Sequence, residues 1–239
     1  MHIIRLKRLL LYFALTLACI AVIMVIISKH SRPREAAAVI PLRTEYSLII
    51  DAGHGGFDGG AEANGIAEAP LNLAISLRLR DLLRFAGISA LMTREDGGSL
   101  DFNAEAEVRE NKVADLKARL RLAQENPECD FLSIHLNKFE QEKYYGAQVF
   151  YSPNREESRI LALALQDSMI ALLDPQNTRR AKMAPDTVFL MKKITSPAVT
   201  VECGFLSNVR EAELLQNDAY QKRIAMSVMQ GYINYLKGQ

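Results

Sequence analysis

The sequence predicts an α/β fold, a single domain with a mostly parallel central sheet flanked by helices, preceded by one N-terminal transmembrane helix. Short apolar segments of strand length alternate with longer helical patterns after residue 46. Several of these segments are apolar throughout, which is typical of strands in a sheet covered on both faces. Of the 239 residues, 49% are hydrophobic, enough for one good-sized core. A long uncharged stretch near the start of the chain predicts the membrane helix.

This uncharged stretch occupies positions 9–28 and follows Arg5, Lys7 and Arg8. The apolar core of a cleavable signal peptide has roughly 7–15 residues, whereas a membrane span needs about 20. No small-residue cleavage site follows the stretch. We therefore expect a signal anchor over residues 1–30, with a buried core helix as the alternative.

Behind the anchor we expect a linker over residues 31–45 and an exported domain over residues 46–239, on the extracytoplasmic face of the cell membrane. Residues 1–35 hold six Lys or Arg and one Glu, a net charge of +5, so the rest of the chain carries −4 of the total +1. A mildly acidic domain has no electrostatic reason to bind nucleic acid. Cys129 and Cys203 are interpreted as small buried residues, because one possible bridge is no disulfide framework.

The first two elements of the domain have clear patterns. The segment YSLIIDAG at 46–53 is a short run rich in Ile and Leu that a glycine ends, which predicts a strand. The segment at 69–87 has Leu71, Ile75 and Leu79 on one helical face, a proline in its first turn and a glycine at its end. These features predict an amphipathic helix.

The later elements alternate in the same way, with apolar runs for strands and long stretches of good helix formers for helices. In chain order we expect a strand at 88–96, a helical region at 103–126, strands at 129–137 and 145–153, a helix at 155–174, a strand at 197–205 and a closing helix at 220–238.

Chemically reactive side chains fall at or near the ends of three of these strands. Residues 46–239 contain only two histidines, His54 just after the first strand and His135 near the end of the third, and Glu202 lies near the end of the apolar fifth strand. Ligands of open α/β sheets bind beyond the carboxyl ends of the strands, so we expect these side chains to lie together. A structural hydrogen-bonding role is the alternative for each histidine. A carboxylate among apolar neighbours needs a partner or has a perturbed pKa.

Histidine and carboxylate ligands suit zinc, and catalytic zinc commonly has three protein ligands and one open position. Glu68 is a reasonable third ligand, because the loop DAGHGGFDGG at 51–60 could fold back to bring His54 and Glu68 to one site. Five of the chain's thirteen glycines lie in this loop, which indicates an unusual backbone path. On spacing alone Asp51, Asp58 and Glu62 compete with Glu68.

Six segments of the chain carry a family resemblance. In order they are IIDAGHGGFDGGA, GIAEAPLNLAISLRLRDLL, LMTRED, LKARLRLAQ, LSIHLN and PAVTVECGFLSN. Together they resemble the zinc-dependent N-acetylmuramoyl-L-alanine amidases of the Amidase_3 type, over about residues 46–237. The short chain, and SIHLN followed by GAQVFYS, look most like the germination-specific amidases of spore-forming bacteria.

The resemblance implies hydrolysis of the amide bond between N-acetylmuramic acid and L-alanine in peptidoglycan, in spore cortex maturation or germination. The partner would be a peptidoglycan glycan strand with its stem peptides, and any accessory activator is unknown. His54, Glu68 and His135 match the ligands of one Zn²⁺ per chain. Glu202 matches the catalytic glutamate, which takes a proton from water and delivers it to the leaving nitrogen.

The remaining candidates rest on weaker arguments. Asp51 is a candidate for orienting His54, because ligating histidines usually donate their other N–H to a carboxylate or carbonyl, but a turn role is the alternative. Asn137 is a candidate substrate contact or a turn residue, and Arg119 is expected to pair on a helix. Lys138 stands where the family often has a small residue, a departure that bears on substrate contacts. The role of Arg94 stays open.

Three other functions are alternatives to this one. The domain could be a catalytically inactive peptidoglycan-binding protein, although the ligand set is complete. It could be a different metal-dependent cell-wall hydrolase, such as a polysaccharide deacetylase, but its motifs do not match. A phosphate cradle is disfavoured, because the glycine loop lacks the Lys-Ser/Thr of a P-loop and carries two acidic residues, Asp51 and Asp58.

Overall fold

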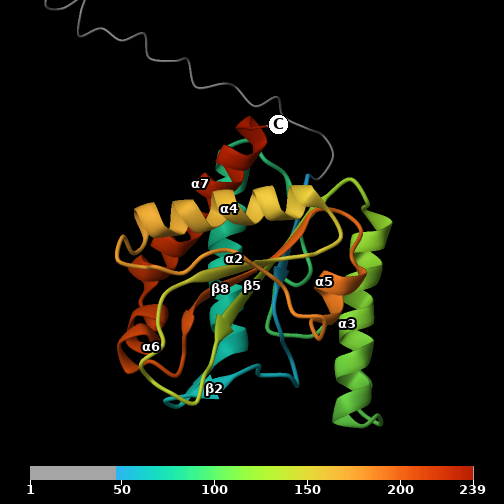
Figure 1. Ribbon diagram of the computed structural model, residues 1–239. Coiled ribbons are helices and arrows are strands. Elements are labelled where there is room, and N and C mark those ends of the chain that lie inside the picture. The colour runs from blue at the N-terminus through green and yellow to red at the C-terminus, as the bar shows by residue number, and fades with distance from the viewer. Residues whose placement is uncertain (1–46, 239) are drawn as a thin grey trace, which may run out of the picture. The chain divides into compact units, whose positions relative to one another are not determined.

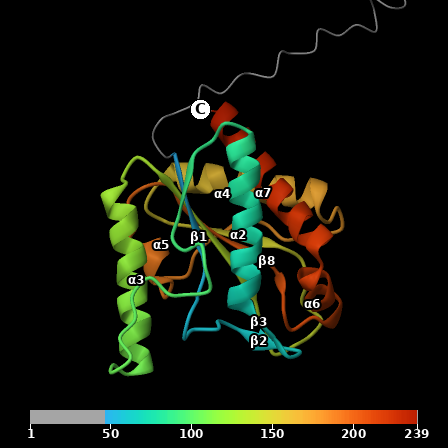
Figure 2. The ribbon, with the colours of Figure 1, turned by 180° about the vertical axis from the view of Figure 1, so that it is seen from behind.

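The computed structural model describes residues 47–238, so the expected signal anchor at 1–30 and linker at 31–45 lie outside the described residues. The described part is an α/β unit with a six-stranded sheet in the order β4-β1-β5-β8-β6-β7. Helices lie on both sides of this sheet (Figure 1, Figure 2). No helix within residues 47–238 is long and apolar enough to cross a membrane.

The strands of the main sheet are mostly short. They are β1 (Leu48–Ala52), β4 (Ala90–Met92), β5 (Asp130–Asn137), β6 (Gln148–Tyr151), β7 (Lys182–Met183) and β8 (Ala198–Phe205). A separate hairpin consists of β2 (Glu62–Ala63) and β3 (Ile66–Ala67). The helices are α2 (Glu68–Phe85), α3 (Val108–Glu125), α4 (Glu156–Leu172), α5 (Phe189–Lys193), α6 (Val209–Gln216) and α7 (Asp218–Lys237).

The sheet is parallel except at one pair. β1, β4, β5 and β8 run in the same direction, whereas β6 is antiparallel to β8. The central strands β1, β5 and β8 are adjacent, so their carboxyl ends meet at one edge. The mostly parallel sheet predicted from the sequence is therefore confirmed, and this edge is where ligands bind in open α/β sheets.

The two faces of the sheet differ in polarity because successive residues of a strand point to opposite sides. One face packs against α2 and α4, on which α7 packs in turn, and is apolar along its length, with Leu132 and Ile134 of β5 beside Val199 and Val201 of β8. The other face packs against α3 and α5. It begins with Phe131 and Ala198 in an apolar cluster and becomes polar toward the carboxyl ends, where Ser133, His135, Thr200 and Glu202 follow.

Each of the nine predicted elements is present, and four local features were missed. These are the β2–β3 hairpin, β7, α5 and α6, which are short and carry little periodic signal. The helical region expected at 103–126 begins at Val108, because Glu107 and Glu110 form a capping box that starts the helix there. Cys129 and Cys203 are both buried, as expected.

Candidate metal centre and catalytic cleft

Three side chains with metal-binding atoms meet at the carboxyl edge of the sheet. His54 follows β1, His135 lies in β5, and Glu68 is the first residue of α2. One donor atom from each lies within 4.8 Å of the other two. Glu68 Oε1 is 2.9 Å from His135 Nδ1, and Glu68 Oε2 is 3.3 Å from His54 Nε2. Residues separated by 81 positions in the sequence thus form one cluster.

The glycine-rich loop is a tight turn that has no room for a side chain at several of its glycines. A Cβ atom on Gly53 would lie 2.3 Å from the His135 ring. Gly60 has φ +73°, and a Cβ atom there would lie 2.7 Å from both Glu68 Oε2 and His54 Cδ2. Gly55 and Asp58 exchange two backbone hydrogen bonds of 2.9 and 3.0 Å, which close the turn. The glycines therefore allow the ligand side chains to approach one another.

His54 itself adopts a backbone conformation that few non-glycine residues take, with φ +60°. Such a conformation costs roughly 1–3 kcal/mol and persists only where surrounding contacts fix it. Arg119 supplies one of these contacts, because its Nη2 donates to the carbonyl oxygen of His54 at 2.7 Å and its Nη1 to that of Ala52 at 2.9 Å. The loop is therefore held from below by a buried guanidinium.

A second buried arginine holds the same segment from another side. The Nε of Arg94 donates to the carbonyl oxygen of Ala52 at 2.9 Å, and its Nη2 donates to those of Gly53 and Ala69 at 3.1 and 2.9 Å. Arg94 therefore ties the end of β1 to the start of α2, and so fixes the two segments that carry His54 and Glu68. Arg94, whose role the sequence leaves open, is thus a support of the ligand segments.

Asp51 is a candidate for orienting His54, whereas no orienting role is predicted for Asp58. Asp51 does not lie at the ring of His54; it accepts hydrogen bonds from Ser133 Oγ at 2.6 Å and Thr93 Oγ1 at 2.9 Å and pairs with Arg119. The residue beside His54 Nδ1 is Asp58, whose Oδ2 lies 2.9 Å away. Asp51 therefore supports the loop through Arg119 and through Thr93, whose hydroxyl accepts from the backbone N–H of Ala52 at 3.2 Å, and Asp58 orients the imidazole.

Arg119 pairs on its helix, as predicted from the sequence, with Asp115 Oδ2 2.7 Å from its Nε. Arg119 also pairs with Asp51 and is only 2% exposed, neither of which the sequence analysis predicts. Burial by itself raises the pKa of Asp51, but the charge of Arg119 and hydrogen bonds from Ser133 and Thr93 hold it below its ordinary value. Asp51 is therefore a buried carboxylate whose charge is fully compensated.

The electrostatics of the donor cluster favour a cation. Burial by itself lowers the pKa of His54, but hydrogen bonds and charge from Glu68 and Asp58 raise it to about 9. Burial by itself raises the pKa of Glu68, but hydrogen bonds to His135 and His54 and their charges hold it well below its ordinary value. In the chain alone, a proton on the His54 imidazole thus offsets part of the negative charge of Glu68 and Asp58. A divalent cation would replace this proton and bind the same lone pairs.

Glu202 stands beside this cluster on the neighbouring strand, where it is the register partner of His135. Its Oε2 is buried and has no hydrogen-bond partner among residues 47–238. Burial raises the pKa of Glu202 to about 7, with the charge of Glu68 adding to the rise and the two histidines opposing it. This carboxyl is therefore able to accept and release a proton near neutral pH.

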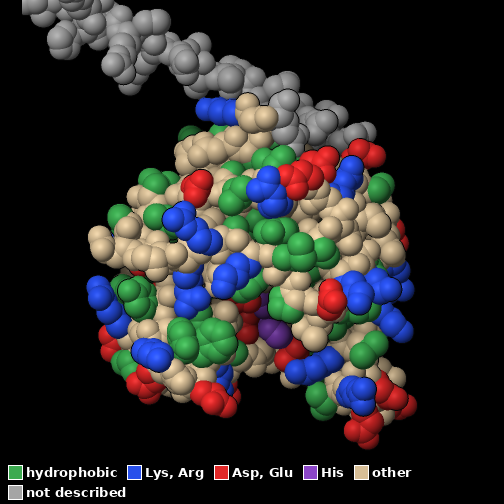
Figure 3. All heavy atoms as spheres, in the orientation of Figure 1, with side chains coloured by type: hydrophobic (Ala, Val, Ile, Leu, Met, Phe, Trp, Pro, Cys, Tyr) green, Lys and Arg blue, Asp and Glu red, His purple; other side chains and the backbone are tan. Residues whose placement is uncertain are grey.

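The cluster opens into a cleft with a volume of about 390 Å³. Its floor includes His135, Asn137 and Glu202, and its opposite wall is formed by Ala184 and residues 187–191, in and before α5. Figure 3 looks into this region, where histidine side chains lie at the bottom of a hollow with acidic side chains beside them. Asn137 lines the cleft, as a substrate contact would, and its side chain accepts a hydrogen bond from the backbone N–H of Lys138 at 2.8 Å, as a turn residue would.

The donor set fits zinc. Two imidazoles and one carboxylate are ligands that zinc accepts, and three protein ligands leave a position open toward the cleft. The buried Oε2 of Glu202, which has no partner among the described residues, belongs to a side chain that lines the cleft. The arrangement therefore has the parts required for metal-assisted hydrolysis.

Comparisons with known proteins agree with this chemistry. The Amidase_3 family model, described as N-acetylmuramoyl-L-alanine amidase, matches residues 48–234. The germination-specific N-acetylmuramoyl-L-alanine amidase of Bacillus subtilis is 35% identical over 188 residues, which cover 79% of this chain and 78% of that protein.

Solved structures of similar proteins share the fold. The CwlD amidase from Clostridioides difficile, solved in complex with the GerS lipoprotein, has a TM-score of 0.78 and 39% identity, over 82% of this chain and all of that one. An N-acetylmuramoyl-L-alanine amidase from Clostridium difficile 630 has a TM-score of 0.71 and 26% identity over the same shares. The chain thus belongs to the Amidase_3 family of N-acetylmuramoyl-L-alanine amidases, which hydrolyse the amide between N-acetylmuramic acid and L-alanine in peptidoglycan.

Proposed function

We propose that the amidase activity of this chain depends on one Zn²⁺ held by His54, Glu68 and His135, with Glu202 as the catalytic proton carrier. The observation that carries the proposal is the convergence of three donor atoms within 4.8 Å of one another beside a buried carboxylate oxygen without a partner. Asp58 orients His54 through the second ring nitrogen, as carboxylates commonly do for ligating histidines.

An amide is a poor electrophile and water a poor nucleophile, and the site addresses both problems. When bound, zinc polarises the carbonyl oxygen and lowers the pKa of water from about 15.7 toward ~7. Glu202 removes the proton from the attacking water, and its raised pKa then allows it to give that proton up. The recipient is the alanine nitrogen, which has to leave as a neutral amine. Asn137 lines the cleft in a position to contact the substrate.

The direct test uses purified full-length chain on isolated peptidoglycan, with and without a chelator. We expect one zinc per chain by metal analysis, new L-alanine N-termini in the products, and loss of both after chelation. Zinc binding without release of stem peptide would instead identify a binding protein. Release of free acetate would identify a deacetylase.

We also propose that the activity serves spore cortex maturation or germination. The support is the similarity to the Bacillus subtilis amidase named for germination and to the CwlD amidase. The test is expression of this chain in a Bacillus subtilis strain that lacks its own germination-specific amidase. Recovered germination supports the role, whereas an active enzyme that leaves germination defective contradicts it.

The location and partners of the chain form a further part of the proposal. Peptidoglycan lies outside the cytoplasmic membrane, so we place the catalytic domain at residues 46–239 there or in the spore envelope, anchored through residues 9–28. The CwlD amidase was solved in complex with the GerS lipoprotein, so we include an accessory protein among the partners proposed for this chain. Protease digestion of intact cells tests the location, since an exported domain is degraded without lysis.

A further inference from the structure

A second groove, with a volume of about 810 Å³, continues from the catalytic cleft. The two share Asn137, Phe150 and Pro185 in their linings. A substrate whose scissile bond lies at Glu202 can therefore extend into this groove without leaving the surface. The groove is not needed for the bond-breaking chemistry itself, so its side chains require a separate explanation.

The groove carries an excess of positive charge. Lys138, Arg179 and Lys182 line it, and Glu140 is its one acidic lining residue. Within residues 47–238 none of the three cations forms an ion pair, and the side-chain hydrogen bonds of Lys138 and Arg179 are with oxygens of uncharged groups. The charge of Glu211 acts on Arg179 without a direct ion pair, whereas no carboxylate contact is described for Lys138 and Lys182. An excess of cations in a concave surface suits an anionic ligand.

Arg179 is held in a fixed orientation. Its Nε donates to the carbonyl oxygen of Tyr145 at 2.6 Å and its Nη1 to Gln148 Oε1 at 2.9 Å. Its guanidinium lies 4.4 Å from the centroid of the Phe205 ring. These contacts leave Nη2 available for a ligand. A guanidinium positioned before binding loses little freedom when it binds a carboxylate.

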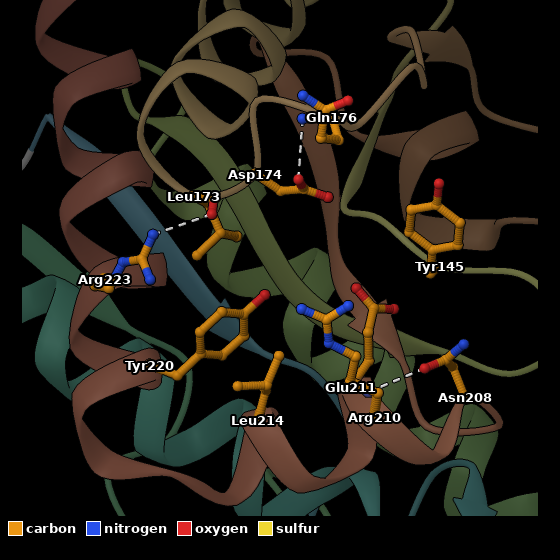
Figure 4. A pocket seen from close by; sticks show the side chains of 10 residues that line it. All are labelled: Tyr145, Leu173, Asp174, Gln176, Asn208, Arg210, Glu211, Leu214, Tyr220 and Arg223. Atoms are coloured by element: carbon orange, nitrogen blue, oxygen red, sulfur yellow. Dashed lines mark hydrogen bonds between the residues drawn. The ribbon is translucent and has the colours of Figure 1, made fainter.

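The segments that hold Arg179 are themselves fixed by Glu211, on the side away from the groove. Glu211 of α6 accepts hydrogen bonds from the backbone N–H groups of Gly146 at 3.0 Å and Phe205 at 2.8 Å. Figure 4 shows Glu211 near Tyr145 in a separate pocket of about 510 Å³, which shares no lining residue with the groove. The residues that orient Arg179 are therefore fixed by the fold rather than by a ligand in the groove.

The strand register places this cation close to the chemistry. Gln148, which accepts from Arg179, is the register partner of Glu202 on the adjacent strand. Neighbouring strands lie about 4.8 Å apart. Arg179 thus lies one side chain beyond the catalytic carboxylate, within reach of the first residues of a bound substrate.

The chemistry of the substrate decides which part enters the groove. The stem peptide is joined to the sugar through the nitrogen of its first residue, so it has no α-ammonium group, but its free end is a carboxylate. The N-acetylmuramic acid side is neutral, because its own carboxyl group is part of the amide. We propose that this groove binds the stem peptide and that Arg179 and Lys182, assisted by Lys138, receive its carboxylate; this rests on the amidase function proposed above.

The test compares two soluble substrates, an N-acetylmuramoyl peptide with a free C-terminal carboxylate and the same compound with a C-terminal amide. For the carboxylate substrate we expect Arg179→Gln and Lys182→Gln each to raise KM about three- to tenfold, with kcat little changed, because an exposed charge pair is worth this much in binding. For the amide substrate neither variant should change KM. Lys237→Gln, at the far end of α7, is the matched control and should behave as wild type with both substrates.

The variants separate folding from binding. Arg179→Gln can disturb the loop at Tyr145, but the side chain of Lys182 has no hydrogen bond or ion pair within residues 47–238, so Lys182→Gln tests the charge alone. If wild type discriminates between the substrates and Lys182→Gln does not, the proposal stands. Equal KM values for the two substrates in wild type overturn it while the amidase function stands. Equal losses on both substrates would also overturn it, because they show that these cations do not act through the terminal carboxylate. No hydrolysis by wild type would defeat the proposed function instead.

Discussion

His54 Nδ1 lies 2.9 Å from Asp58 Oδ2, four positions along the glycine-rich loop. The other ring nitrogen of His54 faces Glu68, so the carboxylate of Asp58 fixes both the tautomer and the direction of the imidazole. Asp58 Oδ1 in turn lies 2.9 Å from Lys112 Nζ on α3. The loop therefore carries a ligand and the group that orients it.

Asp58→Asn should weaken zinc binding by about 10- to 100-fold, the usual effect of removing an orienting carboxylate. The measurement is a competition titration with a chromogenic chelator. Lys112→Gln removes the other partner of Asp58 and leaves the carboxylate in place, so its zinc affinity should fall by much less. Equal affinities of Asp58→Asn and wild type would show that His54 needs no orientation by this residue.

Gly53→Ala should weaken metal binding. Its new Cβ atom would lie 2.3 Å from the His135 ring, so the ring has to move away from the other donors. We expect zinc affinity and peptidoglycan hydrolysis to fall at least about tenfold, in line with the loss of a ligand's geometry. Gly97→Ala is the control, because nothing lies within 4 Å of a Cβ atom at that position. Activity of Gly53→Ala equal to that of Gly97→Ala would contradict the close packing of this loop.

The positions of His54, His135 and Glu202 were predictable because each follows or ends an apolar run, and the topology of a parallel sheet brings such ends together. The third ligand was not predictable from spacing. Only the family resemblance points to Glu68, because no periodic signal shows which acidic residue the glycine-rich loop brings beside His54.

The supports of the site were harder still to predict. Arg119 reaches back 68 positions to Asp51, and Arg94 reaches 42 positions to Ala52. These contacts depend on how α3 and the end of β4 pack beneath the loop. A single sequence shows only that the arginines exist. The short elements β7 and α5, which form walls of the cleft and groove, left no pattern either, because tertiary contacts rather than propensity set them.

Glu202→Gln should keep zinc and lose turnover. The substitution preserves shape and leaves the three ligands untouched, but an amide cannot carry the proton from water to the leaving nitrogen. General acid–base catalysis by one side chain is worth about 10²–10⁴ in rate, and we expect a loss of this size in kcat on peptidoglycan. Zinc content measured on the same sample is the control. A variant with full zinc and the wild-type rate would rule out Glu202 as the proton carrier.

The stability of the zinc-free protein should depend on pH through the same residue. The pKa of Glu202 is raised from 4.5 to about 7 in the folded chain, so between these values the folded state keeps a proton that the unfolded state has lost. Its contribution to stability is therefore full below pH 4.5 and is lost as the pH rises through 7. The difference in unfolding free energy between wild type and Glu202→Gln, from urea titrations with chelator present, should change by about 3 kcal/mol over this range. A difference that stays constant with pH would show that burial does not raise this pKa.

Arg119→Met should destabilise the fold itself. It leaves Asp51 and Asp115 without their cation and removes the donors to the carbonyl oxygens of Ala52 and His54. Breaking a buried ion pair from one side costs about 3–5 kcal/mol, which urea unfolding can measure. Arg121→Met, two positions further along the same helix, removes an exposed pair and should cost no more than about 0.5 kcal/mol.

The double variant Asp51→Asn, Arg119→Met shows how much of the stability loss comes from the buried charge of Asp51, because it removes that uncompensated charge. Stability should recover in part, since an amide is less costly to bury than a lone carboxylate. Zinc affinity should not recover, because the carbonyl oxygens of Ala52 and His54 still lack their donor and the strained conformation of His54 is no longer held. Recovery of both would mean that Arg119 only neutralises Asp51 and does not position the ligand loop.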